Sequence, residues 1–289
     1  RYANFMNTNI LQREFDELRN APDLFIEHNF RARKEALDFV QIISEMYSSE
    51  NIELDVLKKD VEEFGERLRS YNNELFQGFY QRLKDKKPRK DEFRTWLLPY
   101  TDYVANDWGK QHYGYESLDF LLDGVFLPRP HPHLSLEPEY GMVRYEPTPA
   151  SVILELTERL NLKERDIFYD LGSGLGKVTL LVHLLTGVKV VGVEYQPDFC
   201  AYASRQADEL DLEGLRYLND DARHVDYSDG SVFFLFNPFG GVIFDSVLEK
   251  LHIEAKRREI LICSYGSSSR PLSELEWLEP VAPLFSDEM

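Results

Sequence analysis

The sequence predicts an α/β fold, a doubly wound and mostly parallel sheet, preceded by an all-α N-terminal domain. The first observation behind this prediction is a short β-rich run, a glycine-rich turn, a helical pattern and a second apolar run, in this order from Asp166 to Glu194. The second is an N-terminal part that is poor in Gly and Pro and rich in helix formers. The third is the distribution of charge, which divides the chain into two parts. Residues 1–110 carry 18 basic and 21 acidic side chains, whereas residues 111–289 carry 15 basic and 30 acidic ones.

The composition of the 289 residues limits the class of protein. Hydrophobic residues make up 43% and aromatic residues 13%, which excludes a disordered or fibrous chain. The net charge of −18 disfavours nucleic acid as a partner. Two distant cysteines, Cys200 and Cys263, exclude a disulfide scaffold and favour a reducing cytoplasm. We find no apolar stretch of membrane-spanning length and no secretory leader, so we expect a cytoplasmic protein without a membrane partner.

A helical N-terminal domain is expected over residues 1–110. One long helix is predicted from about residue 52 to 83, because apolar residues recur there at alternating steps of four and three. These positions are Leu57, Val61, Phe64, Leu68, Tyr71 and Leu75. Residues 31–47 have the pattern of an antiparallel partner. A bundle that packs on the second domain fits this pattern, and a coiled-coil arm that forms a homodimer is the alternative.

Between the two domains, residues 111–144 are expected to form a linker or a lid. Four prolines between residues 127 and 140 exclude a helix interior there. His131 and His133 lie in this stretch without acidic or Cys partners at ligand spacing, so no metal site is predicted. The basic run of residues 84–90 is expected to be a solvated loop, with contact to an anionic partner as the minor alternative.

The segment from Ile167 to Glu194 has the pattern of a strand–helix–strand unit with a glycine turn. The glycines are Gly172, Gly174 and Gly176, and an apolar helical pattern follows them. In open α/β sheets, ligands bind at the carboxyl ends of the strands. Glycines let the backbone approach a ligand closely, and the free amides of the next helix favour negative groups.

The residues around the glycine turn narrow the class of ligand. A dinucleotide fingerprint needs a small residue where Lys177 stands, and a P-loop needs Gly at Leu171 and Ser or Thr at Val178. A carboxylate at Asp170 would repel a pyrophosphate but suits an ammonium group. An amino-acid head joined to a nucleoside describes S-adenosylmethionine, which is the ligand we predict.

The run Asp170-Leu-Gly-Ser-Gly-Leu-Gly176 resembles the first motif of class I, Rossmann-like S-adenosylmethionine-dependent methyltransferases, acid-x-Gly-x-Gly-x-Gly. The resemblance extends from about Tyr145 to Gly266 and implies a methyltransferase domain over residues 145–289. It also implies that an acid after the second strand binds the ribose and that an Asp-Ala pair after the third binds the adenine, with Asp220 as an alternative to Asp221. The cofactor-binding residues so implied are Asp170, Gly172, Ser173, Gly174, Gly176, Glu194, Asp221 and Ala222.

A finer similarity connects this region with the core of the non-SET histone-lysine methyltransferases. It implies that Tyr145 and Thr148 belong to a loop that closes over the cofactor. The sequence departs from that family at Lys177, where the family has Gln, and at Pro238, where it has Asn. No basic tail that could hold nucleosomal DNA is evident.

The methyl acceptor is expected to bind at the end of the fourth strand. Asn237, Pro238 and Phe239 lie where related amine methylators hold the acceptor nitrogen, so this resemblance implies that they form the catalytic site. The expected function is methyl transfer to an unidentified acceptor, a small molecule or a basic protein, without a metal. A protein-lysine methyltransferase and an inactive cofactor-binding scaffold remain as alternatives. The tail after Gly266 is short for the family's final antiparallel strand pair, so a truncated sheet is expected, with one further strand at Trp277, Leu278 and Val281 as the alternative.

Overall fold

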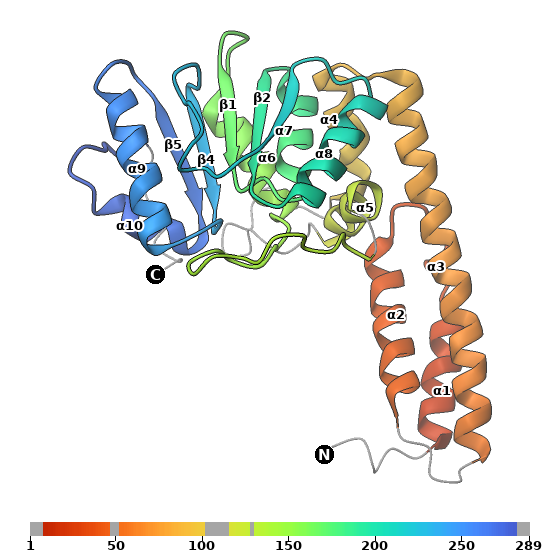
Figure 1. Cartoon of the computed structure of the whole chain (residues 1–289). Coiled ribbons are helices and arrows are strands. Elements are labelled where there is room, and N and C mark those ends of the chain that lie inside the picture. Colours follow the sequence, from red (N-terminus) through yellow and green to blue (C-terminus); the bar gives the residue numbers. More distant parts are fainter. Residues whose placement is uncertain (1–7, 47–51, 102–115, 128–129, 282–289) are drawn as a thin grey trace. The chain divides into compact units, whose positions relative to one another are not determined.

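A computed structural model describes residues 8–46, 52–101, 116–127 and 130–281 of the chain. The chain forms two compact units, which Figure 1 shows coloured along the sequence. The helical unit comprises Arg1–Arg82 and Trp96–Val125, and the sheet unit comprises Leu83–Thr95 and Phe126–Met289. The sheet unit holds every candidate site residue named above.

Helices account for the N-terminal region, as the sequence predicts. They are α1 (Thr8–Arg19), α2 (Phe30–Glu45), α3 (Ile52–Lys86), α4 (Lys90–Leu97), a short 3-10 helix (Leu98–Tyr100) and α5 (Glu116–Phe126). The predicted apolar stripe of α3 is buried at Leu57, Val61, Phe64 and Leu68, and it shares one hydrophobic cluster with α2. Among the described residues, no helix has the combination of length and apolar character needed to cross a membrane.

Five parallel strands form the sheet of the sheet unit, in the order β3-β2-β1-β4-β5. The strands are β1 (Ile167–Leu171), β2 (Lys189–Glu194), β3 (Leu215–Asn219), β4 (Val232–Phe236) and β5 (Leu261–Tyr265). The helices are α6 (Ala150–Leu160), α7 (Lys177–Thr186), α8 (Pro197–Glu209), α9 (Gly241–Ala255) and α10 (Ser269–Ser273), with a 3-10 helix at Gly266–Ser268. Figure 1 shows α6, α7 and α8 on one side of the sheet and α9 on the other, which confirms the doubly wound prediction.

The order of the strands reverses between β1 and β4. From β1 the chain adds β2 and β3 on one side, and it then returns to add β4 and β5 on the other. These two central strands are almost fully buried apolar runs, as expected where helices cover both faces. Ligands in such sheets bind in the crevice at the carboxyl ends of the strands next to the reversal. The fold therefore places a binding site at the ends of β1 and β4.

Residues 130–149, called the strap from here on, cross the carboxyl edge of the sheet without forming a helix (Figure 1). After β2, the amide of Gln196 donates to the Leu136 carbonyl at 2.8 Å and accepts from the Leu136 backbone N–H at 3.1 Å. After β4, Met142 and Phe239 form an isolated antiparallel bridge. The strap is thus fixed at two points beside the ends of β2 and β4.

The structure corrects two expectations. The basic run does not form one loop, because α3 continues to Lys86 and α4 begins at Lys90, and this leaves three residues between the helices. The alternative of a sixth strand near Trp277 is not found, since the described residues form five strands, and beyond β5 they form a 3-10 helix, α10 and turns. Instead, the Trp277 ring stacks on His252 of α9, with ring centroids 4.5 Å apart. The expected linker at 111–144 contains α5 and most of the strap.

Two valines of α9 test how much the helix–sheet contact contributes to stability. Val247 is fully buried in the cluster between α9 and the sheet, whereas Val242 is 76% exposed on the same helix. We expect Val247→Ala to lower the free energy of unfolding by about 2 kcal/mol, because it removes buried methyl groups and leaves a cavity. Val242→Ala should change it by less than about 0.5 kcal/mol. Urea unfolding followed by circular dichroism measures both, and equal effects would contradict the packing described here.

Candidate active site

The glycine loop between β1 and α7 adopts a backbone conformation that would be strained for other residue types. Gly172, Gly174 and Gly176 have φ angles of +83°, +54° and +87°. A Cβ atom on Gly172 would lie 2.4 Å from the Pro238 Cβ, and one on Gly174 would lie 2.4 Å from the Tyr145 Cε2. The glycines therefore provide both the left-handed backbone and the space for two predicted site residues, one after β4 and one in the strap.

Glu194, at the end of β2, holds the glycine loop through its carboxylate. Its Oε2 accepts the Gly174 N–H at 2.7 Å, and its Oε1 accepts the Gln196 N–H at 2.7 Å. Burial raises the pKa of this carboxyl, and the hydrogen bonds from the backbone oppose the rise. The Tyr195 backbone also hydrogen-bonds this carboxylate. The acceptor capacity that remains on its oxygens fits hydroxyl donors such as those of a ribose.

Asp170 is a buried acid without a complete set of partners. Its side chain lies in β1 next to the glycine loop, the residue is 3% exposed, and among the described residues its Oδ2 has no hydrogen-bond partner. Burial and, second, the charge of Glu194 raise the pKa of Asp170 to about 8. Ser173 Oγ, in the loop itself, is also buried and lacks a partner there. A cationic group that donates hydrogen bonds would satisfy the carboxylate, which is the property expected of a site for an ammonium group.

The strap contributes Tyr145 and Thr148 to the same edge of the sheet. The Tyr145 ring lies over Gly174 and makes edge contacts with Phe199 of α8 and with His131, at centroid distances of 5.6 and 5.4 Å. Thr148 is buried just before α6. Tyr145 therefore lies over the glycine loop, where a closing residue was expected.

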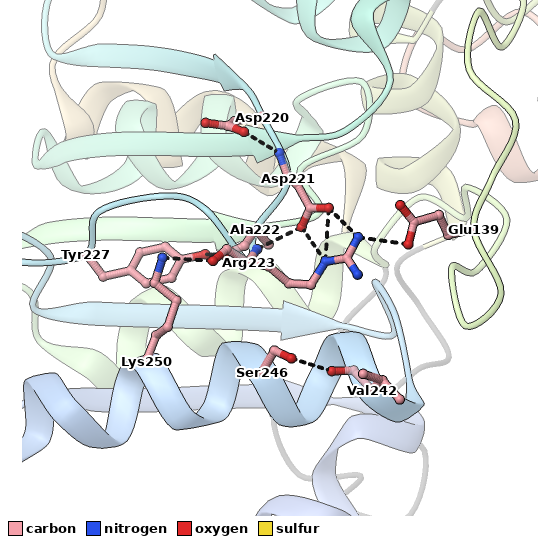
Figure 2. Close-up of polar contacts among 9 residues, drawn as sticks. All are labelled: Glu139, Asp220, Asp221, Ala222, Arg223, Tyr227, Val242, Ser246 and Lys250. Atoms are coloured by element: carbon pink, nitrogen blue, oxygen red, sulfur yellow. Dashed lines mark hydrogen bonds and ion pairs between the residues drawn. The ribbon is translucent and has the colours of Figure 1, made fainter.

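Asp221 and Ala222 follow β3, and Figure 2 shows that Arg223 occupies the Asp221 carboxylate. The guanidinium Nε lies 3.0 Å from each carboxylate oxygen, and Nη2 lies 2.5 Å from Oδ2. Nη2 also donates to Glu139 Oε2 of the strap at 2.8 Å. These bonds lower the pKa of Asp221. Arg223 was missed in the sequence, although its place two residues after an acid was the available signal.

The predicted acceptor residues cluster at the end of β4. Asn237 has a left-handed φ of +45°, and its Oδ1 accepts from the Ser267 hydroxyl at 2.8 Å and the Ser268 N–H at 3.4 Å. The Pro238 carbonyl accepts the Val143 N–H of the strap at 3.3 Å. Phe239 is buried in the core cluster. The two serines after β5 are site neighbours that the sequence did not indicate.

Lys177 is a buried lysine beside the site. It begins α7 directly after the glycine loop, and only 3% of the residue is exposed. Near His131 and His133, and elsewhere in the part of the chain that the structure describes, no group of three or more His, Cys, Asp or Glu side chains is placed to hold a metal ion. The candidate site thus consists of carboxylates, backbone amides and aromatic rings.

The buried acid predicts an unusual dependence of stability on pH. Between about pH 4 and about pH 8 the unfolded chain has lost the Asp170 proton while the folded chain retains it, so stability falls as pH rises. We expect the ligand-free protein to lose up to about 3 kcal/mol of unfolding free energy from about pH 5 to about pH 7. In Asp170→Asn this part of the slope should vanish. Parallel pH profiles of the two proteins in urea unfolding would contradict the assignment.

The comparisons with known proteins agree with this site. Residues 140–235, about a third of the chain, match the family model described as histone methylation protein DOT1. The match includes β1 to β3, most of β4 and the second half of the strap, and it therefore spans the glycine loop, Glu194 and Asp221. Comparison with curated proteins gives no match.

Solved structures of methyltransferases are similar to part of this chain. An RNA methyltransferase from Salinibacter ruber in complex with S-adenosyl-L-homocysteine is 26% identical over 38% of this chain and 71% of its own, with a TM-score of 0.35. A geranyl diphosphate C-methyltransferase from Streptomyces coelicolor is 17% identical over 39% of this chain and 40% of its own, with a TM-score of 0.34. A methyltransferase from Geobacter sulfurreducens is 22% identical over 37% and 43%, with a TM-score of 0.31.

The family match falls on the segment in which the strand order, the three left-handed glycines and the paired acids Asp170 and Glu194 were found. These features agree on the fold and on the cofactor. The sheet unit thus has the doubly wound fold expected of a class I methyltransferase, and residues 140–235 are similar to the family of histone methylation protein DOT1.

Proposed function

We propose that this chain methylates a nitrogen atom, and that its acceptor is a lysine side chain of a basic protein. The Asp170 carboxylate carries the cofactor half of this proposal, because it is buried next to the glycine loop and its Oδ2 has no hydrogen-bond partner among the described residues. The match to the histone methylation family favours a protein acceptor over a small molecule. The excess of acidic residues in residues 111–289 favours a cationic one.

The residues of the site fit the cofactor in distinct ways. S-adenosylmethionine supplies an electrophilic methyl carbon on a sulfonium sulfur, so no nucleophilic side chain is needed. Asp170 would pair with its ammonium group, and Glu194 would accept the two ribose hydroxyls on its remaining acceptor positions. Asp221 would accept the adenine amino group. The chain's task is then to orient the acceptor and to exclude water.

Asn237 is the proposed orienting residue for the acceptor nitrogen. A neutral amine must point its lone pair at the methyl carbon, and hydrogen bonds from its N–H groups to fixed oxygens achieve this. The Ser267 hydroxyl can rotate away from Asn237 Oδ1, and the bond from Ser268 is long, so the oxygen can accept an amine in their place. Phe239 and the strap would keep water from this edge of the sheet.

The surroundings of the strap support a cationic acceptor. Glu137, Glu139 and Glu146 are exposed along it. A small-molecule amine is the alternative acceptor class. We further propose a cytoplasmic protein, with Cys200 and Cys263 as free thiols, and a homodimer formed through the N-terminal helices.

The acceptor class can be tested with cell extract and cofactor carrying a radiolabelled methyl group. We expect label in the protein fraction, on lysine, and not in nucleic acid or small molecules. Replacing Asn237 should reduce turnover about 100-fold while the Kd for S-adenosylhomocysteine stays within about twofold. Both Asn237→Ala and Asn237→Gly should show this loss, since glycine keeps the left-handed backbone. Unchanged turnover would remove Asn237 from the acceptor site, and label in small molecules alone would overturn the protein acceptor.

Cofactor binding should depend on pH through Asp170. Because the pKa of this acid is about 8 and the ammonium group needs the ionised form, affinity for S-adenosylhomocysteine should rise with pH below that value. We expect about a tenfold increase per pH unit from about pH 6 to about pH 7, measured by calorimetry. Asp170→Asn should bind more weakly and lack this component of the pH dependence. The same slope in both proteins would show that another group controls binding.

A further inference from the structure

The two carboxylates proposed to hold the adenosyl group differ in the groups that occupy them. Glu194 is held by backbone N–H groups, which belong to the fixed glycine loop and the start of the segment after β2. Asp221 accepts three N–H groups of Arg223: Oδ1 accepts the backbone N–H, Oδ2 accepts Nη2–H, and the Nε–H is shared between the two oxygens. The mobile guanidinium thus covers both oxygens of Asp221 and competes with an adenine amino group for them.

The guanidinium can move while the backbone of its loop stays in place. The Tyr227 hydroxyl donates to the Ala222 carbonyl at 2.7 Å, and the Lys250 ammonium donates to the Arg223 carbonyl at 2.9 Å (Figure 2). Lys250 also donates to the Val225 carbonyl. These bonds fix the main chain on both sides of Arg223. The Arg223 side chain itself is 25% exposed, so it can rotate toward solvent.

Glu139 gives the guanidinium a second anionic partner, at 2.8 Å in the present arrangement. Glu139 lies in the strap two residues before Gly141, whose carbonyl accepts the Gly240 N–H at 2.7 Å. The next contact of the strap is the bond from the Val143 N–H to the Pro238 carbonyl. A guanidinium that turned fully to Glu139 would remain paired and would hold the strap more firmly at this point.

We propose that Arg223 is a positioning residue that occupies the adenine-binding carboxylate of the ligand-free enzyme and moves to Glu139 of the strap when an adenosyl ligand binds. This inference rests on the proposed function, since it takes Asp221 as the acceptor for the adenine amino group. The movement couples cofactor binding to closure of the strap beside Asn237 and Pro238. The strap then tightens over the acceptor site only in the complex that can transfer a methyl group.

Binding of two homocysteine nucleosides tests the competition at Asp221. Removing the competitor in Arg223→Ala should tighten binding of S-adenosylhomocysteine about fivefold, a typical value for one partly exposed ion pair. S-inosylhomocysteine has a carbonyl oxygen in place of the amino group, so the same variant should not bind it more tightly. Arg216→Ala is the matched control, because it removes an Arg–Asp ion pair of the same unit, at the start of β3, and should leave both Kd values unchanged.

Hydrogen exchange tests the coupling to the strap. Adding S-adenosylhomocysteine to the wild type should slow exchange of the Val143 and Gly240 amides, which join the strap to the segment after β4. Glu139→Gln should lose this added protection while it still binds the ligand, with a Kd raised by the coupling that was lost.

Other outcomes of these experiments would contradict the inference. Weaker or equal binding of S-adenosylhomocysteine by Arg223→Ala overturns the competition, and retained protection in Glu139→Gln overturns the coupling. Binding by none of these proteins, all with normal circular dichroism, would overturn the proposed function and the inference together.

Discussion

The attachment of the glycine loop to the end of β2 is the constraint on which the rest of the site depends. The N–H groups of Gly172 and Ser173 both donate to the Val193 carbonyl at 2.9 Å, and Gly174 donates to Glu194. These bonds need three left-handed residues in a row of five, which only glycine adopts without strain. They hold the loop at the carboxyl edge of the sheet, next to Asp170, Glu194 and the start of α7.

The same loop concentrates negative charge in a buried place. Asp170 and Glu194 both lie out of water, and only Glu194 is compensated by backbone amides. An unpaired buried carboxylate lowers stability unless it holds its proton, which is why the pKa of Asp170 is raised. A cationic ligand would relieve this unfavourable state. The ligand-free fold thus retains a local instability that serves binding, a trade-off common at functional sites.

The strap gives the site its outer wall through polar contacts rather than through a hydrophobic core. It is joined to Gln196 after β2, to Arg223 after β3 and to Pro238 after β4. All three attachment points follow strands of the sheet, so the strap connects the segments after β2, β3 and β4 with one another. Several of its side chains, such as Tyr140 and Glu137, are exposed to solvent.

The sequence by itself determined the order of the strands and helices, the glycine loop and the two buried acids, because these depend on local spacing along the chain. Contacts between distant segments were decided only by the tertiary structure. The bond between Arg223 and Glu139 joins residues 84 positions apart, and Asn237 meets serines that follow another strand. The burial of Lys177 and the stacking of Trp277 on α9 likewise follow from packing, which a residue's immediate neighbours do not specify. A side chain that could bind several partners binds the one that the fold places within reach.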